Sequence, residues 1–331
     1  MRFADLLDEE YLEGFFQEHL SELKLPQQIV RSCKVTPLKL SKRGGKSVLD
    51  FELLLEGVSD GEASQLNLVG IWRPDSANAP VFDLMRWLWT SGFDGRDAHA
   101  ICQPVAYLDD SNLMLVAKIE DVELDRFLRV DTEAARVAVD SAGRWLAKLH
   151  RTLVRGPLAH SVARERELLN AWVRDLGNRF PAYARRLPPL ARGILKVEGR
   201  VAPDQFTLIH GDFHPENIFV NDDRVTVTDF ERSCLFDPAQ DLGFFLGQLA
   251  AKTRMGRYPG GVKYVRQLRD RFLNAYARER PPGLDTRIAA YEARTFLEVP
   301  HYIFCGLGVA PDPSDFEFYV SSAEECAGAV A

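Results

Sequence analysis

The sequence holds few cysteines and no long apolar run. It has five cysteines, an odd number, and none forms a CxxC pair: Cys33, Cys102, Cys234, Cys305 and Cys326. This pattern indicates reduced thiols rather than disulfides or a zinc site. No apolar stretch approaches the length of a membrane span, and the opening residues MRFADLLDEEYLEGFF are acidic where a signal peptide is basic. We therefore expect a cytoplasmic protein.

The chain also lacks an excess of basic residues. Its 48 acidic side chains outnumber 41 basic ones, which gives a net charge of −7. This balance gives no reason to expect nucleic acid or an anionic membrane as a partner. At 331 residues, with 46% apolar and 27% charged residues, the chain has the composition of a globular protein with one large or two modest domains.

The periodicity of apolar residues changes near residue 121. Before it, a leading helix at 3–20 and a second helix at 81–93 accompany strand-like runs at 35–40, 47–57, 66–73, 102–108 and 112–119. After it, helical patterns dominate at 131–153, 161–200 and 262–305, with one short β segment at 207–230. We therefore predict an α+β protein with a small β-rich domain at 1–121, a larger helical domain at 122–331 and a cleft between them.

Residues 210–220, HGDFHPENIFV, gather groups that handle protons and metals and then run into apolar residues. The runs IFV and RVTV flank an Asn-Asp-Asp turn, which predicts a β-hairpin. If Val220 pairs with Arg224, Asp229 becomes the diagonal neighbour of Asn217, about 7–8 Å away. An amide oxygen and a carboxylate at that distance can share one ion, and oxygen ligands suit magnesium.

Asp212 then remains as a free carboxylate on the loop that leads into the hairpin. Phosphoryl transfer to a hydroxyl needs a metal to neutralise phosphate charge and an acid that accepts the hydroxyl proton. The loop and the hairpin together supply both.

The order of these residues resembles a known fold. His210-x-Asp212-x-x-x-x-Asn217, followed by Asp229-Phe230-Glu231, is similar to the catalytic and metal loops of the kinase-like fold. HGD, DFE, the downstream FDPAQDLG (236–243) and the upstream LAKLH (146–150) resemble the aminoglycoside phosphotransferase and choline kinase branch. The resemblance covers about residues 30–310 and implies a bilobal protein kinase-like fold, with a nucleotide-covering N-lobe and an acceptor-binding helical C-lobe.

The resemblance also implies a function and roles for single residues. It implies an ATP-dependent transfer of a phosphoryl group to a hydroxyl of a small molecule, with GTP as an alternative donor and Mg²⁺ as cofactor. Asp212 is then the catalytic base, and Asn217 and Asp229 hold the metal. The remaining residues have supporting roles: His210 shapes the loop, Asp241 braces it through backbone hydrogen bonds, and Glu231 supports the metal ligands from behind or contacts the substrate.

The strand at 66–73 departs from the pattern of this branch. Where the resemblance predicts a lysine for the nucleotide phosphates, the sequence has Ile71. Arg73 is two residues later, on the same face of the strand, and either replaces the charge or ends the strand in solvent. The glycine-containing turn SKRGGKS (41–47) offers Lys42 and Lys46 to phosphates, or is a solvated basic turn. It is not a P-loop, because a strand follows it rather than a helix.

Two alternatives to a kinase stay open. Ile71 favours a nucleotide-binding or scaffold protein with little or no transfer activity, a pseudokinase. A metal-dependent hydrolase built on His210, Asp212 and His214 is the other, and it predicts tightly bound zinc or manganese. The acceptor is not defined by the sequence: late acidic residues coexist with basic runs at 183–196 and 252–271, which suit a neutral sugar, a phosphorylated metabolite or an acid better than a polycation.

Overall fold

The structure is a computed structural model, and the residues it describes are 3–40, 45–59, 61–75, 77–153, 162–259, 261–278, 282–310 and 312–328. The chain divides into two compact units. The smaller comprises Met1–Asp121 and Thr226–Glu231, and the larger comprises Val122–Val225 and Arg232–Ala331. A short return segment of the chain thus belongs to the smaller unit, and this segment carries Asp229.

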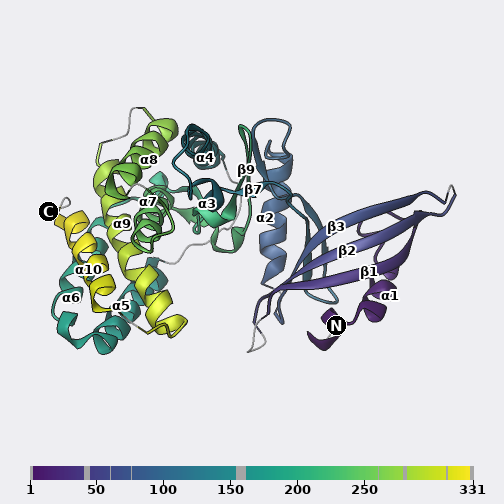
Figure 1. The fold of residues 1–331 in the computed structure, drawn as a ribbon, viewed down its shortest axis with the longest axis horizontal. Coiled ribbons are helices and arrows are strands. Elements are labelled where there is room, and N and C mark those ends of the chain that lie inside the picture. Colours follow the sequence, from purple (N-terminus) through teal and green to yellow (C-terminus); the bar gives the residue numbers. More distant parts are fainter. Residues whose placement is uncertain are drawn as a thin grey trace. The chain divides into compact units, whose positions relative to one another are not determined.

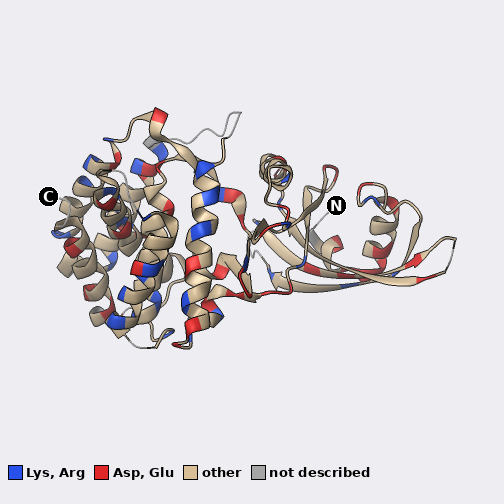
Figure 2. Ribbon diagram, turned by 90° about the horizontal axis from the view of Figure 1, so that it is seen from above, with Lys and Arg blue, Asp and Glu red and all other residues tan. Residues whose placement is uncertain are grey.

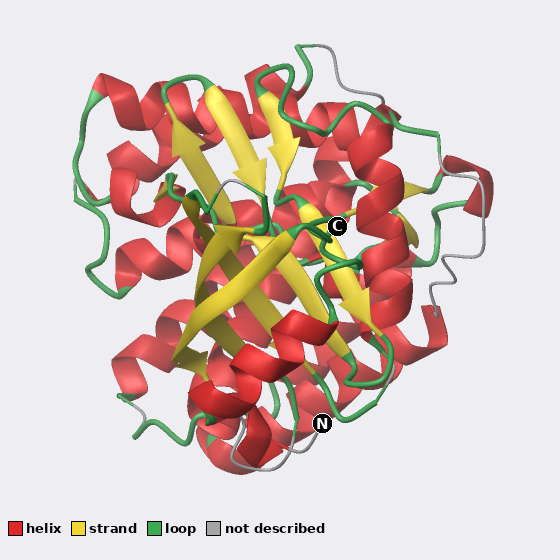
Figure 3. Ribbon diagram, turned by 90° about the vertical axis from the view of Figure 1, so that its right-hand side faces the viewer, coloured by secondary structure: helices red, strands yellow, loops and turns green. Residues whose placement is uncertain are grey.

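The smaller unit is built on one antiparallel sheet (Figure 1). Its strand order is β1-β2-β3-β6-β5, with bounds β1 Gln28–Lys39, β2 Ser47–Gly57, β3 Ala63–Trp72, β5 Pro104–Leu108 and β6 Leu113–Ala117. Two helices accompany the sheet, α1 (Glu9–Glu18) and α2 (Asn78–Thr90), and β4 (His99–Ile101) lies outside it. Figure 3 shows these strands in yellow with helices against them.

Alternation along β2 builds the core of the smaller unit. Leu49, Phe51, Leu53 and Leu55 are buried on one face, as a period of two requires. The ring of Phe16 on α1 packs edge-on against Phe51 at 5.2 Å between centroids. α1 itself begins where the Asp8 side chain accepts a hydrogen bond from an amide of the first turn.

Three sequence expectations for this unit need correction. The helix expected at 3–20 is a 3₁₀ turn, Phe3–Leu7, followed by the shorter α1. The strand expected at 35–40 is the C-terminal end of β1, which begins at Gln28. β1 lies at the edge of the sheet, and its mostly exposed residues do not show the regular apolar alternation that predicts a strand. The strand expected at 102–108 is β5, which begins only at Pro104, and the separate strand β4 precedes it. The strand expected at 47–57 is confirmed as β2, residue for residue.

The larger unit is mainly helical. Its long helices are α4 Glu133–Arg151, α5 Val162–Arg179, α6 Leu187–Glu198, α7 Ala239–Arg254, α8 Gly261–Tyr276, α9 Leu284–Pro300 and α10 Pro313–Gly328. Its short elements are β7 Val122–Glu123, α3 Leu124–Phe127, β8 Thr207–Ile209, β9 Ile218–Asn221 and β11 Cys234–Phe236. β10, Arg224–Val227, crosses from this unit into the smaller one. A small antiparallel sheet unit and a larger helical unit confirm the predicted α+β class.

Helices α7 and α9 pack closely because glycine lines their contact. A Cβ atom at Gly243 would lie 2.6 Å from the Cβ atom of Tyr291, which no side chain allows. This packing holds the start of α7, and with it Asp241, in place. Lys and Arg are interspersed with Asp and Glu along most helices of this unit (Figure 2), whereas the charged residues of α10 are all acidic. In the part of the chain that the structure describes, no helix has both the length and the apolar character needed to cross a bilayer.

Candidate functional site

The HGDFHPEN loop lies in the larger unit, between β8 and β9, and ends in a 3₁₀ turn, Pro215–Asn217. Asp241, at the start of α7, accepts two backbone hydrogen bonds from the loop. The amide of His210 donates to its Oδ2 at 2.7 Å, and the amide of Gly211 donates to its Oδ1 at 2.8 Å. Asp241 is itself fully buried. This is the geometry that a brace for the loop requires.

A second contact connects Asp241 to the end of α4. His150 lies 3.0 Å from Asp241 Oδ2 through Nε2 and 3.0 Å from the hydroxyl of Tyr276 through Nδ1. Sequence reasoning noted the LAKLH motif but gave His150 no partner. The partner comes from α7, 91 residues along the chain, which no local pattern reveals.

His210 is a buried part of the loop. Its side chain is 0% exposed and lies edge-on to the rings of Trp145 and Phe213, at 6.5 and 5.9 Å between centroids. Its Nδ1 accepts a hydrogen bond from the amide of Asp212 at 3.3 Å. A fully buried ring that accepts a hydrogen bond from the loop's own backbone is part of the structure of the loop.

Gly211 is required by the shape of the loop. Its φ is +80°, in the left-handed region that favours glycine. A Cβ atom at Gly211 would also collide with the backbone carbonyl of Arg232. The loop and the segment around Arg232 therefore lie backbone to backbone, which brings the Arg232 side chain beside Asp212.

The carboxylate of Asp212 is surrounded by donors. The side-chain nitrogen of Asn217 donates to the backbone carbonyl of Asp212 at 3.0 Å and lies 3.4 Å from Asp212 Oδ2. Arg232 Nη1 lies 3.5 Å from Oδ1, and His214 Nε2 lies 3.8 Å from Oδ2. Burial alone raises the pKa of Asp212, but His214, Arg232 and His210 outweigh it and hold that pKa well below its usual value. Asp212 is thus ionised at neutral pH.

The arginine and the histidine beside Asp212 are each held by a further partner. Arg232 Nη1 donates to Glu298 Oε1, on α9, at 2.9 Å. His214 Nδ1 accepts from the amide of Glu216 at 3.3 Å, so the neutral ring carries its proton on Nε2, the atom that faces Asp212. Sequence reasoning gave Arg232 no role, because its partner Glu298 is far away in the chain, and it used His214 only in the hydrolase alternative.

The smaller unit gathers four of the other predicted residues. Lys46, just before β2, places its Nζ 3.2 Å from both carboxylate oxygens of Asp229. The same Nζ lies 2.5 Å from Glu231 Oε1, and Arg73 Nη1 donates to Glu231 Oε2 at 2.9 Å. Burial by itself lowers the pKa of Lys46, but the two carboxylates outweigh it and raise that pKa. Asp229 has φ +67°, a strained conformation for a residue other than glycine.

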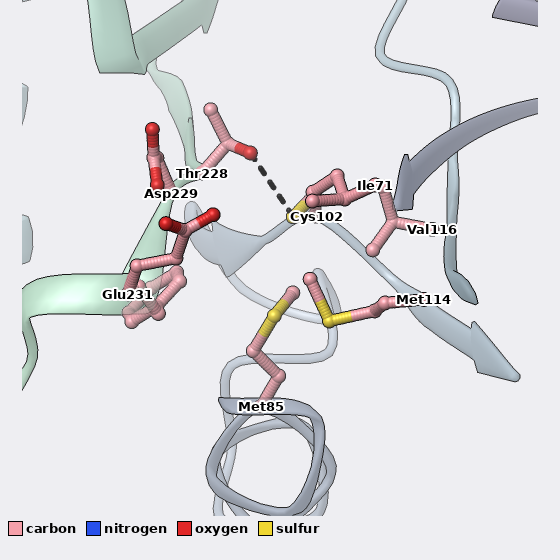
Figure 4. A pocket seen from close by; sticks show the side chains of 9 residues that line it. Ile71, Met85, Cys102, Met114, Val116, Thr228, Asp229 and Glu231 are labelled. Carbon is pink, nitrogen blue, oxygen red and sulfur yellow. Dashed lines mark hydrogen bonds between the residues drawn. The ribbon is translucent and has the colours of Figure 1, made fainter. Parts of the chain in front are cut away.

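Ile71 lies beside this cluster, in apolar surroundings. A small cavity of about 10 Å³, with room for about one water molecule, is lined by Ile71, Met85, Cys102, Met114, Val116, Thr228, Asp229, Phe230 and Glu231. Figure 4 shows Met85 of α2 pointing toward Met114 and Ile71, with the carboxylates of Asp229 and Glu231 on the opposite side of the cavity from Ile71. Burial raises the pKa of the Cys102 thiol to about 12, so this thiol stays protonated. Ile71, at the position where a lysine was expected, thus faces the methionine of α2 and not an acidic side chain of that helix.

The residues predicted to hold the metal offer the oxygen atoms that magnesium prefers. The side-chain nitrogen of Asn217 donates to the carbonyl of Asp212, which leaves the side-chain oxygen of Asn217 for a cation. Asp229 already has a cationic partner in Lys46. Within the described ranges no three His, Cys, Asp or Glu side chains converge on one metal position. Magnesium needs only one or two protein ligands when phosphates supply the others, so these residues fit it. Lys42 lies outside the described residues.

A model of the phosphotransferase enzyme family matches residues 72–286, more than half of the chain. The chain belongs to the phosphotransferase enzyme family. The match contains the whole HGDFHPEN loop, Asp229 and Asp241, and it confirms the resemblance seen in the sequence. No curated protein sequence matches the chain.

Solved structures of this family's fold resemble the chain over most of its length. A choline/ethanolamine kinase family protein from Mesorhizobium loti is 16% identical with a TM-score of 0.57, over 88% of this chain and 87% of that one. An amicoumacin kinase is 13% identical with a TM-score of 0.62, over 89% and 88%. An ethanolamine kinase from Plasmodium vivax is 11% identical with a TM-score of 0.57, over 96% and 87%. At these identities the likeness shows the fold, and it confirms the kinase-like prediction.

Proposed function

We propose that this member of the phosphotransferase enzyme family moves the γ-phosphoryl group of ATP to a hydroxyl of a small molecule. The observation that carries the proposal is the ionised Asp212 on a loop that the buried Asp241 holds through two backbone hydrogen bonds. A rigidly held carboxylate is the group that phosphoryl transfer to a hydroxyl requires of a protein. Similar solved structures hold AMP-PNP with Ca²⁺, or ATP with streptomycin, which supports a nucleotide donor; one with GDP leaves GTP as an alternative.

Asp212 acts as the base in this mechanism. The acceptor oxygen attacks the γ-phosphorus, the bond from that phosphorus to the β,γ-bridging oxygen breaks, and ADP leaves. The hydroxyl proton passes to the Asp212 carboxylate. The low pKa of Asp212 makes it a weak base, so its main contribution is to orient the hydroxyl and to take the proton late, as the phosphorus–oxygen bond forms. His214 and Arg232 keep the carboxylate in one orientation.

We propose Asn217 and Asp229 as the magnesium ligands, the pair that the hairpin register predicts. Magnesium supplies positive charge to the phosphate oxygens when it is bound. Lys46 and Arg73 add two fixed cations for the phosphates, and the pairing of both with Glu231 keeps them close to each other. Lys42 belongs to the same basic turn and stays a prediction.

The acceptor is a small molecule with a hydroxyl group. Similar structures are those of a choline/ethanolamine kinase family protein and of a gentamicin complex. In this chain Arg232 contacts the proposed base directly, and a cationic acceptor would meet its charge at close range. A neutral or anionic acceptor therefore suits this site better than a polycation. We propose neither nucleic acid nor a membrane as a partner of this activity.

Asp212→Asn tests the mechanism. The substitution keeps the size of the side chain but removes the proton acceptor, so we expect nucleotide binding to persist while turnover falls by about 10²–10⁴, the usual contribution of a general base. Calorimetry of ATP and GTP with Mg²⁺, on wild type and on Asp229→Ala, measures binding separately. Unchanged turnover in Asp212→Asn would refute the assignment of Asp212 as the base. A nucleotide affinity in Asp229→Ala equal to that of wild type would refute the assignment of Asp229 as a metal ligand.

The apolar surroundings of Ile71 favour one alternative, a nucleotide-binding scaffold without transfer activity. Such a protein binds nucleotide but transfers nothing to any hydroxyl acceptor. A screen of hydroxyl compounds with [γ-³²P]ATP separates the two functions, because a kinase labels at least one acceptor and a scaffold labels none.

A further inference from the structure

The cluster around Asp229 contains the ammonium of Lys46, whereas Ile71 stands at the position where the resemblance predicts a lysine. Ile71 stands at the lysine position and faces Met85 and Met114 in a cavity with no basic side chain among its lining residues. The pair that bridges strand and helix in kinases is thus replaced by apolar contact (Figure 4).

The register of the sheet explains how Lys46 reaches this place. Val48 on β2 lies opposite Ile71 on β3, so their side chains share one face of the sheet. Lys46 is two residues before Val48 and therefore faces the same side. A long side chain from this position can end close to where a lysine at residue 71 would end.

Lys46 does not extend freely into solvent. Its side chain is 21% exposed, and Asp229 and Glu231 hold its ammonium between them. Arg73 pairs with the other oxygen of Glu231. Glu231 thereby holds two cations beside Asp229.

Asp229 has only two carboxylate oxygens, and Lys46 is 3.2 Å from each. A divalent cation that binds Asp229 from the same side must displace the ammonium, because two cations repel at such distances. Phosphate oxygens are strong acceptors for a lysine ammonium. A nucleotide that takes up the ammonium therefore frees the carboxylate for a metal.

We propose that Lys46 is a shared counter-ion, which replaces the strand-3 lysine as the phosphate ligand and competes with the metal for Asp229, so that metal and nucleotide enter the site together. This inference rests on the proposed function, because it assumes that Asp229 is a metal ligand. Lys46 is expected to strengthen the binding of the nucleotide and to weaken the binding of the metal alone. A merely structural lysine would not produce both.

The test compares Lys46→Met with wild type in two binding experiments. Mn²⁺ alone is titrated and its free concentration read from its electron paramagnetic resonance signal; AMP-PNP with Mg²⁺ is titrated by calorimetry. We expect Lys46→Met to bind Mn²⁺ on the order of tenfold more tightly, a size usual for coupled sites. We expect AMP-PNP to bind about tenfold or more weakly, because one charged hydrogen bond is lost.

Two further variants control the test. Lys34→Met removes an exposed lysine of β1 that pairs only with Glu52 among the described contacts, and both affinities should equal those of wild type. Lys46→Arg keeps a cation at the site, so Mn²⁺ should bind as weakly as in wild type. Circular dichroism checks that each variant is folded.

An unchanged or weaker Mn²⁺ affinity in folded Lys46→Met would overturn the inference, and so would Mn²⁺ binding that is tight in Lys46→Arg. Neither result would touch the proposed function. Failure of AMP-PNP to bind wild type in the presence of Mg²⁺ would contradict the proposed function instead, so the two failures are distinguishable.

Discussion

Arg232 shows how one residue can set the properties of the proposed base. Its guanidinium lies beside Asp212 and is held there by Glu298. It lowers the pKa of Asp212 together with His214, against the opposing effect of burial. An arginine at this place therefore favours the ionised form of the proposed base.

Replacement of Arg232 by alanine should move the acid limb of the activity profile upward. Loss of a cation beside Asp212 raises the pKa of its carboxyl, so protonation of the proposed base begins at higher pH. The measurement is kcat/KM against pH for wild type, Arg232→Ala and Arg232→Lys. Arg232→Lys retains the charge and should follow wild type; an acid limb in Arg232→Ala that coincides with wild type would show that Arg232 does not act on Asp212.

At the scale of elements, α7 holds the loop through Asp241. Close packing of α7 on α9 at Gly243 fixes the helix, and its first turn presents a buried carboxylate to two loop amides and to His150 on α4. Three elements that are separate in sequence meet at one side chain. The loop geometry is thus a property of helix packing and not of the loop alone.

Asp241→Asn should cost both stability and activity. The asparagine side chain keeps one acceptor oxygen where the carboxylate offers two, so one buried amide loses its partner, at about 1–3 kcal/mol. Urea unfolding followed by circular dichroism measures this loss, with Asp204→Asn, at an exposed position of the same unit, as the control. Wild-type stability together with wild-type turnover in Asp241→Asn would mean that the loop does not depend on the brace.

At the scale of the whole molecule, buried charge makes stability depend on pH. Asp125 on α3 is 1% exposed and pairs with Lys252 on α7, which is 4% exposed. Burial opposes ionisation of Asp125, but Arg129, Lys252 and Tyr258 outweigh it and lower its pKa to about 2. A carboxyl with a depressed pKa stabilises the fold above its unfolded pKa and loses this contribution as pH falls.

The stability gap between wild type and Asp125→Asn should therefore close in acid. The contribution of Asp125 is complete above about pH 4 and falls away toward pH 2, by roughly 2 kcal/mol for a shift of this size. Urea unfolding at pH 3 and pH 7 measures the gap for both proteins. A gap that stays constant over this range would show that the Asp125 carboxylate does not have its depressed pKa in the folded protein.

Local patterns predicted much of this protein. The strand at 47–57 and the α+β class follow from alternation and helical spacing, which act over neighbouring residues. β1 was found only in part because an edge strand exposes residues that a buried strand would not. The HGDFHPEN loop was recognised because its residues are close in sequence, and the family match contains it.

The sequence by itself determined the class of fold, the family and the identity of the candidate base, because each depends on residues within a short stretch of chain. Only the tertiary structure decided which groups surround them. Lys46 meets Asp229 across 183 residues, and His150 meets Asp241 across 91. Such partners are chosen by the register of a sheet and the packing of helices, because contacts between distant segments depend on how the entire unit buries its apolar faces.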